Sequence, residues 1–277
     1  MECTVKGIPI YYEVHGSGTP IVMIHGWSVD HRLMSGCMEP VFEGSEGNWQ
    51  RVYLDLPGMG QTPGPDWISG SDDMLSVLLE FIDKIIPKQR FLVAGESFGG
   101  YLARGVLKAR RDLVDGLLLI CPVASQETLR DHLPEFKVLE KDEELLASLS
   151  EEDRNYLTGI NVIQNKRVWE RFKVEIMPAL KIADYDFLEH KLSRHVPFIE
   201  DVDKVTDPYP QPTLMIMGRQ DNCVGYRDHW QLLENFPRAS FMILDKAGHN
   251  LQIEQDELFT AAVNEWLRRV RAESVRP

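Results

Sequence analysis

Short apolar runs recur along this chain, separated by longer amphipathic segments. Within each run the side chains do not alternate between apolar and polar, and each run ends in a polar or glycine-containing loop. Strands with this pattern are typically buried on both faces, as in a parallel sheet. The runs are 21–24, 51–54, 91–94, 117–120 and 214–217.

Segments of helical length and amphipathic pattern lie between these runs, at 74–86, 101–108 and 258–270. An alternation of strand and helix predicts a doubly wound α/β sheet with helices on both faces. Functional groups in such sheets gather at the carboxyl ends of the strands. The N-terminal stretch 4–14, which turns around Gly7, predicts a β-hairpin at one edge of the sheet.

The rhythm breaks between Ser125 and Asp207, where charged, helix-like segments such as 140–155 and 168–180 follow one another without a strand run. An inserted helical cap explains this break. We therefore expect one core made of 1–124 and 208–277, with a cap at 125–207. A length of 277 residues suits one α/β core with such an insertion.

Strand 91–94 leads directly into a G-x-S-x-G motif with Ser97 at its centre, and a helix pattern follows. In this context the motif predicts a nucleophile elbow, a tight turn that exposes a serine hydroxyl above the sheet. The alternative is an ordinary turn between a strand and a helix. Glu96 and Tyr101 are interpreted as structural neighbours of the turn, although Glu96 could face the pocket.

A serine hydroxyl needs a base to become a nucleophile, and a histidine base needs an acid to hold its tautomer. Asp221 follows strand 214–217, and His249 follows the last apolar run, 241–244. They stand 124 and 28 residues apart in the order serine, acid, histidine, which is typical of this elbow. The other carboxylates considered for the acid are less suitably placed; they are Asp201, Asp228 and Asp245.

A tetrahedral intermediate also needs backbone N–H donors for its oxyanion. The residue after the nucleophile, Phe98, is expected to supply one donor. The loop after strand 21–24 begins with His25, Gly26 and Trp27, so the Trp27 N–H is the second candidate. The alternative for this loop is a simple turn.

Taken together, these motifs resemble the α/β-hydrolase superfamily over nearly the whole chain. The resemblance implies an eight-stranded, mostly parallel sheet with a cap after the sixth strand, and a loop at 55–62 that shapes the site without a chemical step. The motifs that carry it are His25-Gly26-Trp27, Asp55 to Thr62, Gly95 to Gly100, Gly218 to Asp221 and Gly248-His249.

Two departures narrow the branch of that superfamily. Ser97 stands where epoxide hydrolases and haloalkane dehalogenases have an aspartate nucleophile, and the H-G-G-P-G segment of proline iminopeptidases is absent after strand 21–24. The resemblance then implies a carboxylesterase-like serine hydrolase that forms an acyl-enzyme and needs no metal or organic cofactor. The alternatives are a carbon–carbon bond hydrolase or lyase with the same triad, and a non-catalytic ligand receptor.

The cap contains apolar residues at helical spacing, which predicts one apolar helix face. This face either packs the cap onto the core or roofs an apolar acyl pocket. The residues of the face are Trp169, Phe172, Ile176, Met177 and Leu180, of which Trp169, Phe172 and Met177 are the candidates for substrate binding.

The formal charge of −13 disfavours nucleic acid and anionic membranes as partners. No apolar run approaches the ~18–20 residues of a membrane span, and the N-terminus lacks a signal pattern, so we expect a cytoplasmic protein with a small acyl substrate. A homo-oligomer is compatible with the sequence.

The four cysteines are scattered and form no C-x-x-C pair. We expect reduced thiols packed as small apolar residues, with Cys223 the least settled because it lies two residues after Asp221. The cysteines are Cys3, Cys37, Cys121 and Cys223.

Overall fold

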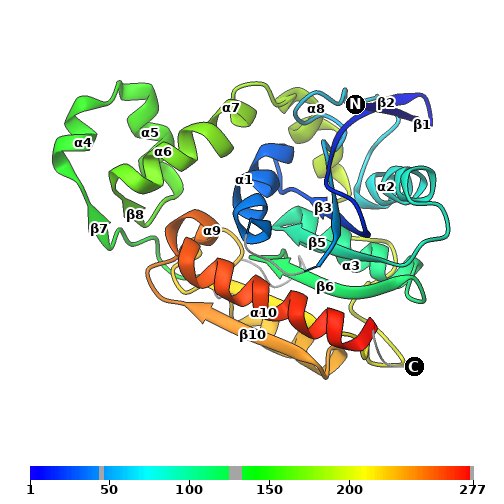
Figure 1. Cartoon of the computed structure of the whole chain (residues 1–277). Coiled ribbons are helices and arrows are strands. Elements are labelled where there is room, and N and C mark those ends of the chain that lie inside the picture. The colour runs from blue at the N-terminus through cyan, green and yellow to red at the C-terminus, as the bar shows by residue number, and fades with distance from the viewer. Residues whose placement is uncertain (44–46, 125–132, 275–277) are drawn as a thin grey trace.

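An eight-stranded sheet forms the centre of the computed structural model, which describes residues 1–43, 47–124 and 133–274 (Figure 1). The strand order is β1-β2-β4-β3-β5-β6-β9-β10. β2 is antiparallel to both its neighbours, and every pair from β4 to β10 is parallel, which confirms the expected mostly parallel sheet. The strands are β1 (Glu2–Val5), β2 (Ile8–His15), β3 (Thr19–Ile24), β4 (Trp49–Leu54), β5 (Phe91–Glu96), β6 (Val114–Ile120), β9 (Thr213–Gly218) and β10 (Ala239–Leu244).

The apolar runs of the sequence lie in the middle of this sheet. β5 and β9 are buried along their whole length, as strands covered on both faces must be. The predicted edge hairpin is confirmed as β1 and β2, which join through a turn at Lys6 and Gly7, both with positive φ.

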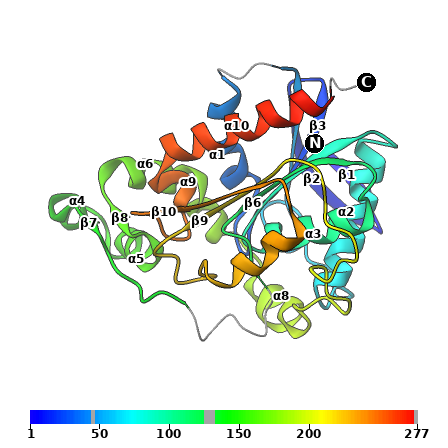
Figure 2. The ribbon, with the colours of Figure 1, turned by 90° about the horizontal axis from the view of Figure 1, so that it is seen from below.

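Helices cover both faces of the sheet (Figure 2). Two of them, α1 and α10, pack together on one face, while α2 and α3 pack together on the other. The helices of the core are α1 (His31–Phe42), α2 (Ser71–Ile85), α3 (Phe98–Ala109), the 3₁₀ helix η2 (Asp228–Asn235), α9 (Leu251–Glu254) and α10 (Asp256–Ser274).

A mainly helical segment connects β6 to β9, and its first helices project beyond the sheet in Figure 1. The expected starting point of the insertion, Ser125, lies outside the described residues. The helices of the segment are α4 (Glu143–Ser148), α5 (Glu151–Ile160), α6 (Lys166–Glu175), α7 (Met177–Leu180), α8 (Tyr185–His190) and the 3₁₀ helix η1 (Leu192–Arg194).

Two expectations for this segment are wrong. It contains two short strands, β7 (Glu140–Lys141) and β8 (Ile163–Gln164), which pair in parallel although they are far apart in sequence. Strands of two residues are too short to produce a periodic pattern, so only the tertiary fold reveals them.

The second error concerns the apolar face at 168–180, which does not lie on one continuous helix. The helix α6 ends at Glu175, Ile176 has φ −122° and ψ −56°, and α7 begins at Met177. Pro178 explains the break, because a proline inside a helix has no N–H to donate and its ring clashes with the carbonyl four residues earlier. Trp169 and Met177 therefore belong to different helices.

The inserted segment is fixed to the core near its C-terminal end and near its middle. Near its C-terminal end, Tyr101 on α3 accepts a hydrogen bond from the Phe198 N–H at 3.0 Å, and Arg104 donates to Asp203. Nearer the middle, α6 packs against α1 and α9. Within the described part of the chain, every helix is too short or too polar to cross a bilayer.

The pair between Arg104 and Asp203 provides a test of this anchoring. Arg104 Nε and Nη2 lie 2.6 and 3.0 Å from the two carboxylate oxygens, and the arginine side chain is 1% exposed. Asp203→Asn leaves a buried charge without its ionic partner, so we expect a loss of about 3–5 kcal/mol in the free energy of unfolding. Denaturant unfolding measures this loss.

The matched control is Asp115→Asn, which breaks the more exposed pair with Arg90. We expect that variant to lose at most about 1 kcal/mol, as surface pairs usually do. Equal losses for the two variants would contradict the anchoring role of Arg104.

Candidate active site

Ser97 occupies a strained turn between the end of β5 and the start of α3. Its φ of 52° and ψ of −116° are sparsely populated by residues with a side chain, and its N–H donates to the Ile120 carbonyl at 2.9 Å. The buried strand before it and the helix after it leave the turn no room to relax. Such a turn holds a serine side chain above the sheet.

Close backbone contacts explain the glycines of the motif. A Cβ atom on Gly95 would lie 2.2 Å from the Gly99 carbonyl oxygen, and one on Gly99 would lie 2.2 Å from the Ile24 carbonyl oxygen. Because both obstacles are backbone atoms, they cannot move aside. Side chains at these positions would force β3, β5 and α3 apart.

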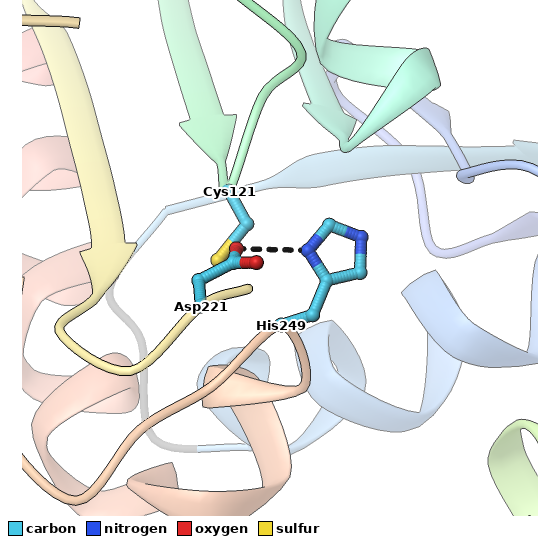
Figure 3. Close-up of side chains that lie close together, drawn as sticks. All are labelled: Cys121, Asp221 and His249. Atoms are coloured by element: carbon cyan, nitrogen blue, oxygen red, sulfur yellow. Dashed lines mark hydrogen bonds and ion pairs between the residues drawn. The ribbon is translucent and has the colours of Figure 1, made fainter. Parts of the chain in front are cut away.

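The structure brings Ser97, His249 and Asp221 together from the turns that follow β5, β10 and β9. The Oγ of Ser97 lies 3.0 Å from His249 Nε2, and His249 Nδ1 lies 2.8 Å from Asp221 Oδ2. Figure 3 shows the imidazole directed at the carboxylate. The Asp221 side chain is fully buried, and the His249 side chain is 12% exposed.

Asp221 is held as an anion that orients His249. Burial by itself would raise the pKa of Asp221, but His249 and the backbone N–H groups of Val224 and Cys223 hold it below its usual value. Burial opposes protonation of His249, yet Asp221 raises the pKa of that imidazole well above its usual value. The proton on Nδ1 therefore faces Asp221, which directs the Nε2 lone pair of the neutral imidazole at Ser97.

The other three carboxylates considered for the acid lie in different surroundings. Asp245 accepts a hydrogen bond from Gln220, Asp201 accepts one from the Asp203 N–H, and Asp228 begins η2. The carboxylate bonded to His249 Nδ1 is that of Asp221.

The two candidate oxyanion donors lie side by side. The rings of Trp27 and Phe98 meet edge to face, with centroids 5.3 Å apart. Phe98 is the first residue of α3, where the helix offers its N–H no intrahelical acceptor. Trp27 follows β3, and a Cβ atom on the preceding Gly26 would lie 3.1 Å from Ser97 Cβ, so this loop borders the serine closely.

His25 holds that loop in place. Its Nδ1 lies 2.8 Å from the Gly26 carbonyl and its Nε2 accepts a hydrogen bond from the Leu56 N–H at 3.0 Å, so the imidazole is neutral with its proton on Nδ1. Burial accordingly lowers the pKa of His25. This histidine links the loop after β3 to the segment that begins at Asp55.

Glu96 faces the site. Of the two interpretations of Glu96 from the sequence, the structure therefore favours the one in which its side chain faces the pocket. Its Oε1 lies 3.4 Å from His249 Nε2, and a Cβ atom on Gly26 would lie 2.1 Å from its Oε2. The side chain is 3% exposed, and burial raises the pKa of Glu96 to about 7. A second carboxyl group thus contacts the nitrogen that faces Ser97.

The sequence did not place Cys121 at the site, but it lies beside Asp221 and His249 in Figure 3. It follows β6 with a φ of 38°, and burial raises the pKa of its thiol. The one sequence feature that could have predicted this location is that Cys121 directly follows an apolar strand. Cys37 and Cys121 are buried as expected, whereas Cys223 is exposed and its packing was predicted wrongly.

In the part of the chain that the structure describes, two groups of side chains place metal-ligating atoms close together: Cys121, Asp221 and His249, and Asp30, His31 and Asp55. The first group contains a protonated thiol and an Asp–His pair that is already hydrogen-bonded. In the second, the carboxylate of Asp55 accepts bonds from His31 and from the backbone of Gln61. The metal-ligating atoms of both groups already take part in hydrogen bonds or are protonated, so we assign a metal to neither group.

The three substrate-binding candidates of the inserted segment are buried. Trp169 and Met177 are each 7% exposed, and Phe172 is fully buried. Because α6 packs against α1 and α9, Trp169 and Phe172 lie on a helix that meets the core, and Met177 belongs to the same buried apolar cluster. Burial is compatible both with packing and with lining a pocket.

Comparison with known proteins agrees with this architecture. The model of the alpha/beta hydrolase family matches residues 21–262. The pimeloyl-[acyl-carrier protein] methyl ester esterase of Legionella pneumophila strain Paris is 23% identical, over 94% of this chain and 99% of that protein. The 2-hydroxy-6-oxo-6-(2'-aminophenyl)hexa-2,4-dienoic acid hydrolase of Metapseudomonas resinovorans is 24% identical, over 98% and 91%.

A solved structure extends the similarity to the whole chain. The crystal structure of an alpha/beta superfamily hydrolase from Oenococcus oeni PSU-1 is 31% identical and superposes with a TM-score of 0.87. The match covers 98% of this chain and 99% of that one.

The contact between Glu96 and His249 predicts a measurable coupling. An anionic Glu96 favours the protonated imidazole, so Glu96→Gln should lower the pKa of His249. An NMR titration of the His249 ring protons measures this pKa. The matched control is Glu175→Gln, which changes a buried carboxylate bonded to Arg171 instead. An unchanged His249 pKa in Glu96→Gln would show that the two groups are not coupled.

Proposed function

The chain belongs to the alpha/beta hydrolase family, and from this membership we propose that it is a serine hydrolase that cleaves a small carboxylic ester through an acyl-enzyme on Ser97. The hydrogen-bonded series from Ser97 through His249 to Asp221 is the observation that carries this proposal. The series lies at the carboxyl ends of parallel strands, where this class of sheet places its chemistry.

The first half of the reaction forms the acyl-enzyme. His249 Nε2 takes the proton from Ser97 Oγ as the oxygen attacks the carbonyl carbon of the ester. The anionic Asp221 stabilises the imidazolium that results. His249 then gives the proton to the departing alcohol, and the acyl group remains on Ser97.

The second half returns the enzyme to its starting state. A water molecule attacks the acyl carbon while His249 accepts its proton. The bond from the acyl carbon to Ser97 Oγ then breaks as His249 returns the proton to Oγ, and the acid product leaves. In both halves the N–H groups of Phe98 and Trp27 are proposed to bind the oxyanion, as preorganised donors do in other acyl transfers. This chemistry requires no metal and no organic cofactor.

We propose that the inserted segment 125–207 is a cap over this site and that Trp169, Phe172 and Met177 take part in binding the acyl group. All three are buried, and Trp169 and Phe172 lie on α6, which packs against α1 and α9, so an apolar surface at this place is supported. Small-molecule sites are usually concave and apolar in this way.

A free small ester fits this chain better than a substrate attached to a carrier protein. The Legionella relative is named for an ester on an acyl-carrier protein. The net charge of −13 on this chain would repel, at a distance, any carrier protein that is also negatively charged. We therefore propose an ester that diffuses freely. We also propose that the protein is cytoplasmic.

One alternative has a specific observation in its favour. The Metapseudomonas relative is named as a hydrolase of a hydroxy-oxo dienoic acid rather than of an ester. The same triad could serve a carbon–carbon bond hydrolase or lyase. Parallel assays with nitrophenyl esters and with vinylogous diketones discriminate between the two activities.

The main test of the proposal is covalent labelling. A fluorophosphonate should add once to the folded protein, at Ser97, and Ser97→Ala should lower ester turnover by about 10⁴–10⁶-fold because the nucleophile is lost. Mass spectrometry of the digested protein locates the adduct. A stoichiometric adduct on another serine would refute the assignment.

The control for the acid uses the carboxylates that compete with Asp221. Asp221→Asn should keep the fold and lose about 10⁴-fold in turnover, because an amide can hold the wrong histidine tautomer. Asp201→Asn and Asp228→Asn should keep near-normal turnover. The opposite result would show that another carboxylate is the acid.

The proposed role of the cap predicts a change in selectivity. Replacing Trp169 or Met177 by alanine should alter the ratio of kcat/KM between short and long acyl esters, because each change enlarges the pocket. Val168→Ala is the control on the same helix and should affect stability alone. If every variant loses about 2–5 kcal/mol of stability and none changes this ratio, the surface only packs the cap onto the core.

A further inference from the structure

Glu254, at the end of α9, has a buried carboxylate that accepts three backbone hydrogen bonds. Its Oε2 accepts from the Gly248 N–H at 2.6 Å. Its Oε1 accepts from the N–H groups of Val162 and Ile163, at 2.7 and 3.2 Å. Glu254 is 1% exposed. Nothing in the proposed chemistry uses this group.

The three donors belong to two different parts of the molecule. Gly248 directly precedes His249, whereas Ile163 begins β8 in the inserted segment and Val162 immediately precedes that strand. The two parts also touch directly, since a Cβ atom on Gly248 would lie 3.2 Å from Val162 Cγ1. One side chain therefore joins the backbone beside His249 to the backbone of the insertion.

A second set of bonds joins the same two parts on the other side of His249. Asn250 donates from Nδ2 to Asn161 Oδ1 at 2.9 Å. Arg167 on α6 donates to the carbonyls of Ile253 and Glu254, at 2.8 and 2.9 Å. The residues on both sides of His249 are thus bonded to the segment around β8 and α6.

The energetics of burial make these bonds difficult to give up. Burial raises the pKa of Glu254 to about 7, and the three N–H donors act against this rise by stabilising the anion. If the carboxylate were removed, three buried N–H groups would be left without this acceptor, and unsatisfied buried donors are unfavourable. The carboxylate and its three N–H donors therefore each depend on the other for a hydrogen-bond partner.

We propose that Glu254 is a positioning residue for His249, through which the inserted segment sets the place of the imidazole beside Ser97. This inference rests on the proposed function, because the position of His249 matters for turnover only if His249 is the base. His249 Nε2 lies 3.0 Å from Ser97 Oγ, and proton transfer needs that contact. A shift of β8 is transmitted through Glu254 to Gly248 and from there to the imidazole.

The test is Glu254→Gln, which keeps the size of the side chain and replaces one acceptor oxygen with an NH₂ group. That group faces N–H donors, so the variant cannot hold both Gly248 and β8. Misplacement of a catalytic group by about 1 Å can cost 100-fold, so kcat for a nitrophenyl ester should fall by about 10- to 100-fold. KM should stay near the wild-type value. Amide hydrogen exchange should become faster at Gly248 and at Val162 and Ile163.

Two further variants separate positioning from general stability. Glu175→Gln changes a different buried carboxylate, on α6. This variant should keep the wild-type kcat and the wild-type rate of amide exchange at Gly248, even if its melting temperature falls. Glu254→Asp keeps the charge but is shorter by one methylene, and it should show an intermediate loss of kcat. It also provides the measurement if Glu254→Gln does not fold.

The inference is overturned if the Glu254 variants keep kcat within about two-fold of wild type, or if the exchange of Gly248 stays slow. Failure of the proposed function gives a different pattern. In that case wild-type protein does not react with a fluorophosphonate at Ser97. Exchange at Gly248 and β8 would still reveal the link through Glu254, because exchange does not depend on activity.

Discussion

The close approach of backbones around Ser97 is the constraint on which the rest of the site depends. The elbow fits between β3, β5 and α3 because Gly95 and Gly99 carry no side chain where carbonyl oxygens would lie about 2 Å from a Cβ atom. This contact fixes the strained conformation of Ser97. It also places Phe98 at the start of α3 and brings Trp27 against it. A single steric requirement thus brings together Ser97 and the two residues that are candidates for the oxyanion hole.

His249 is surrounded by carboxyl groups with different tasks. Asp221 is buried but bonded to backbone N–H groups, so it stays anionic and orients the imidazole. Glu96 contacts the opposite nitrogen, and burial raises its pKa to about 7. Glu254 bonds to the backbone beside the histidine rather than to its ring. The three carboxyl groups therefore act differently because each has different partners: Asp221 orients the ring, Glu96 contacts its other nitrogen, and Glu254 bonds to the neighbouring backbone.

The inserted segment is bound closely to the core around His249. Its β8 and α6 supply donors to Glu254 and to the carbonyls of α9, and its C-terminal part is tied to α3 through Arg104. This attachment has two physical consequences. It covers surface on α1 and α9, and, as we propose, it makes the geometry around His249 depend on the position of the segment through backbone hydrogen bonds.

The sequence by itself determined the parallel sheet, the elbow and the order of Ser97, Asp221 and His249, because buried strands and glycine-bounded turns are local patterns. It did not reveal β7 and β8, the exposure of Cys223, or the places of Cys121 and Glu254. Each of these depends on contacts between segments far apart in the chain. Glu254 and Val162 are 92 residues apart, and no local period relates them. Only the tertiary structure, which brings such segments into hydrogen-bonding distance, decides what they do.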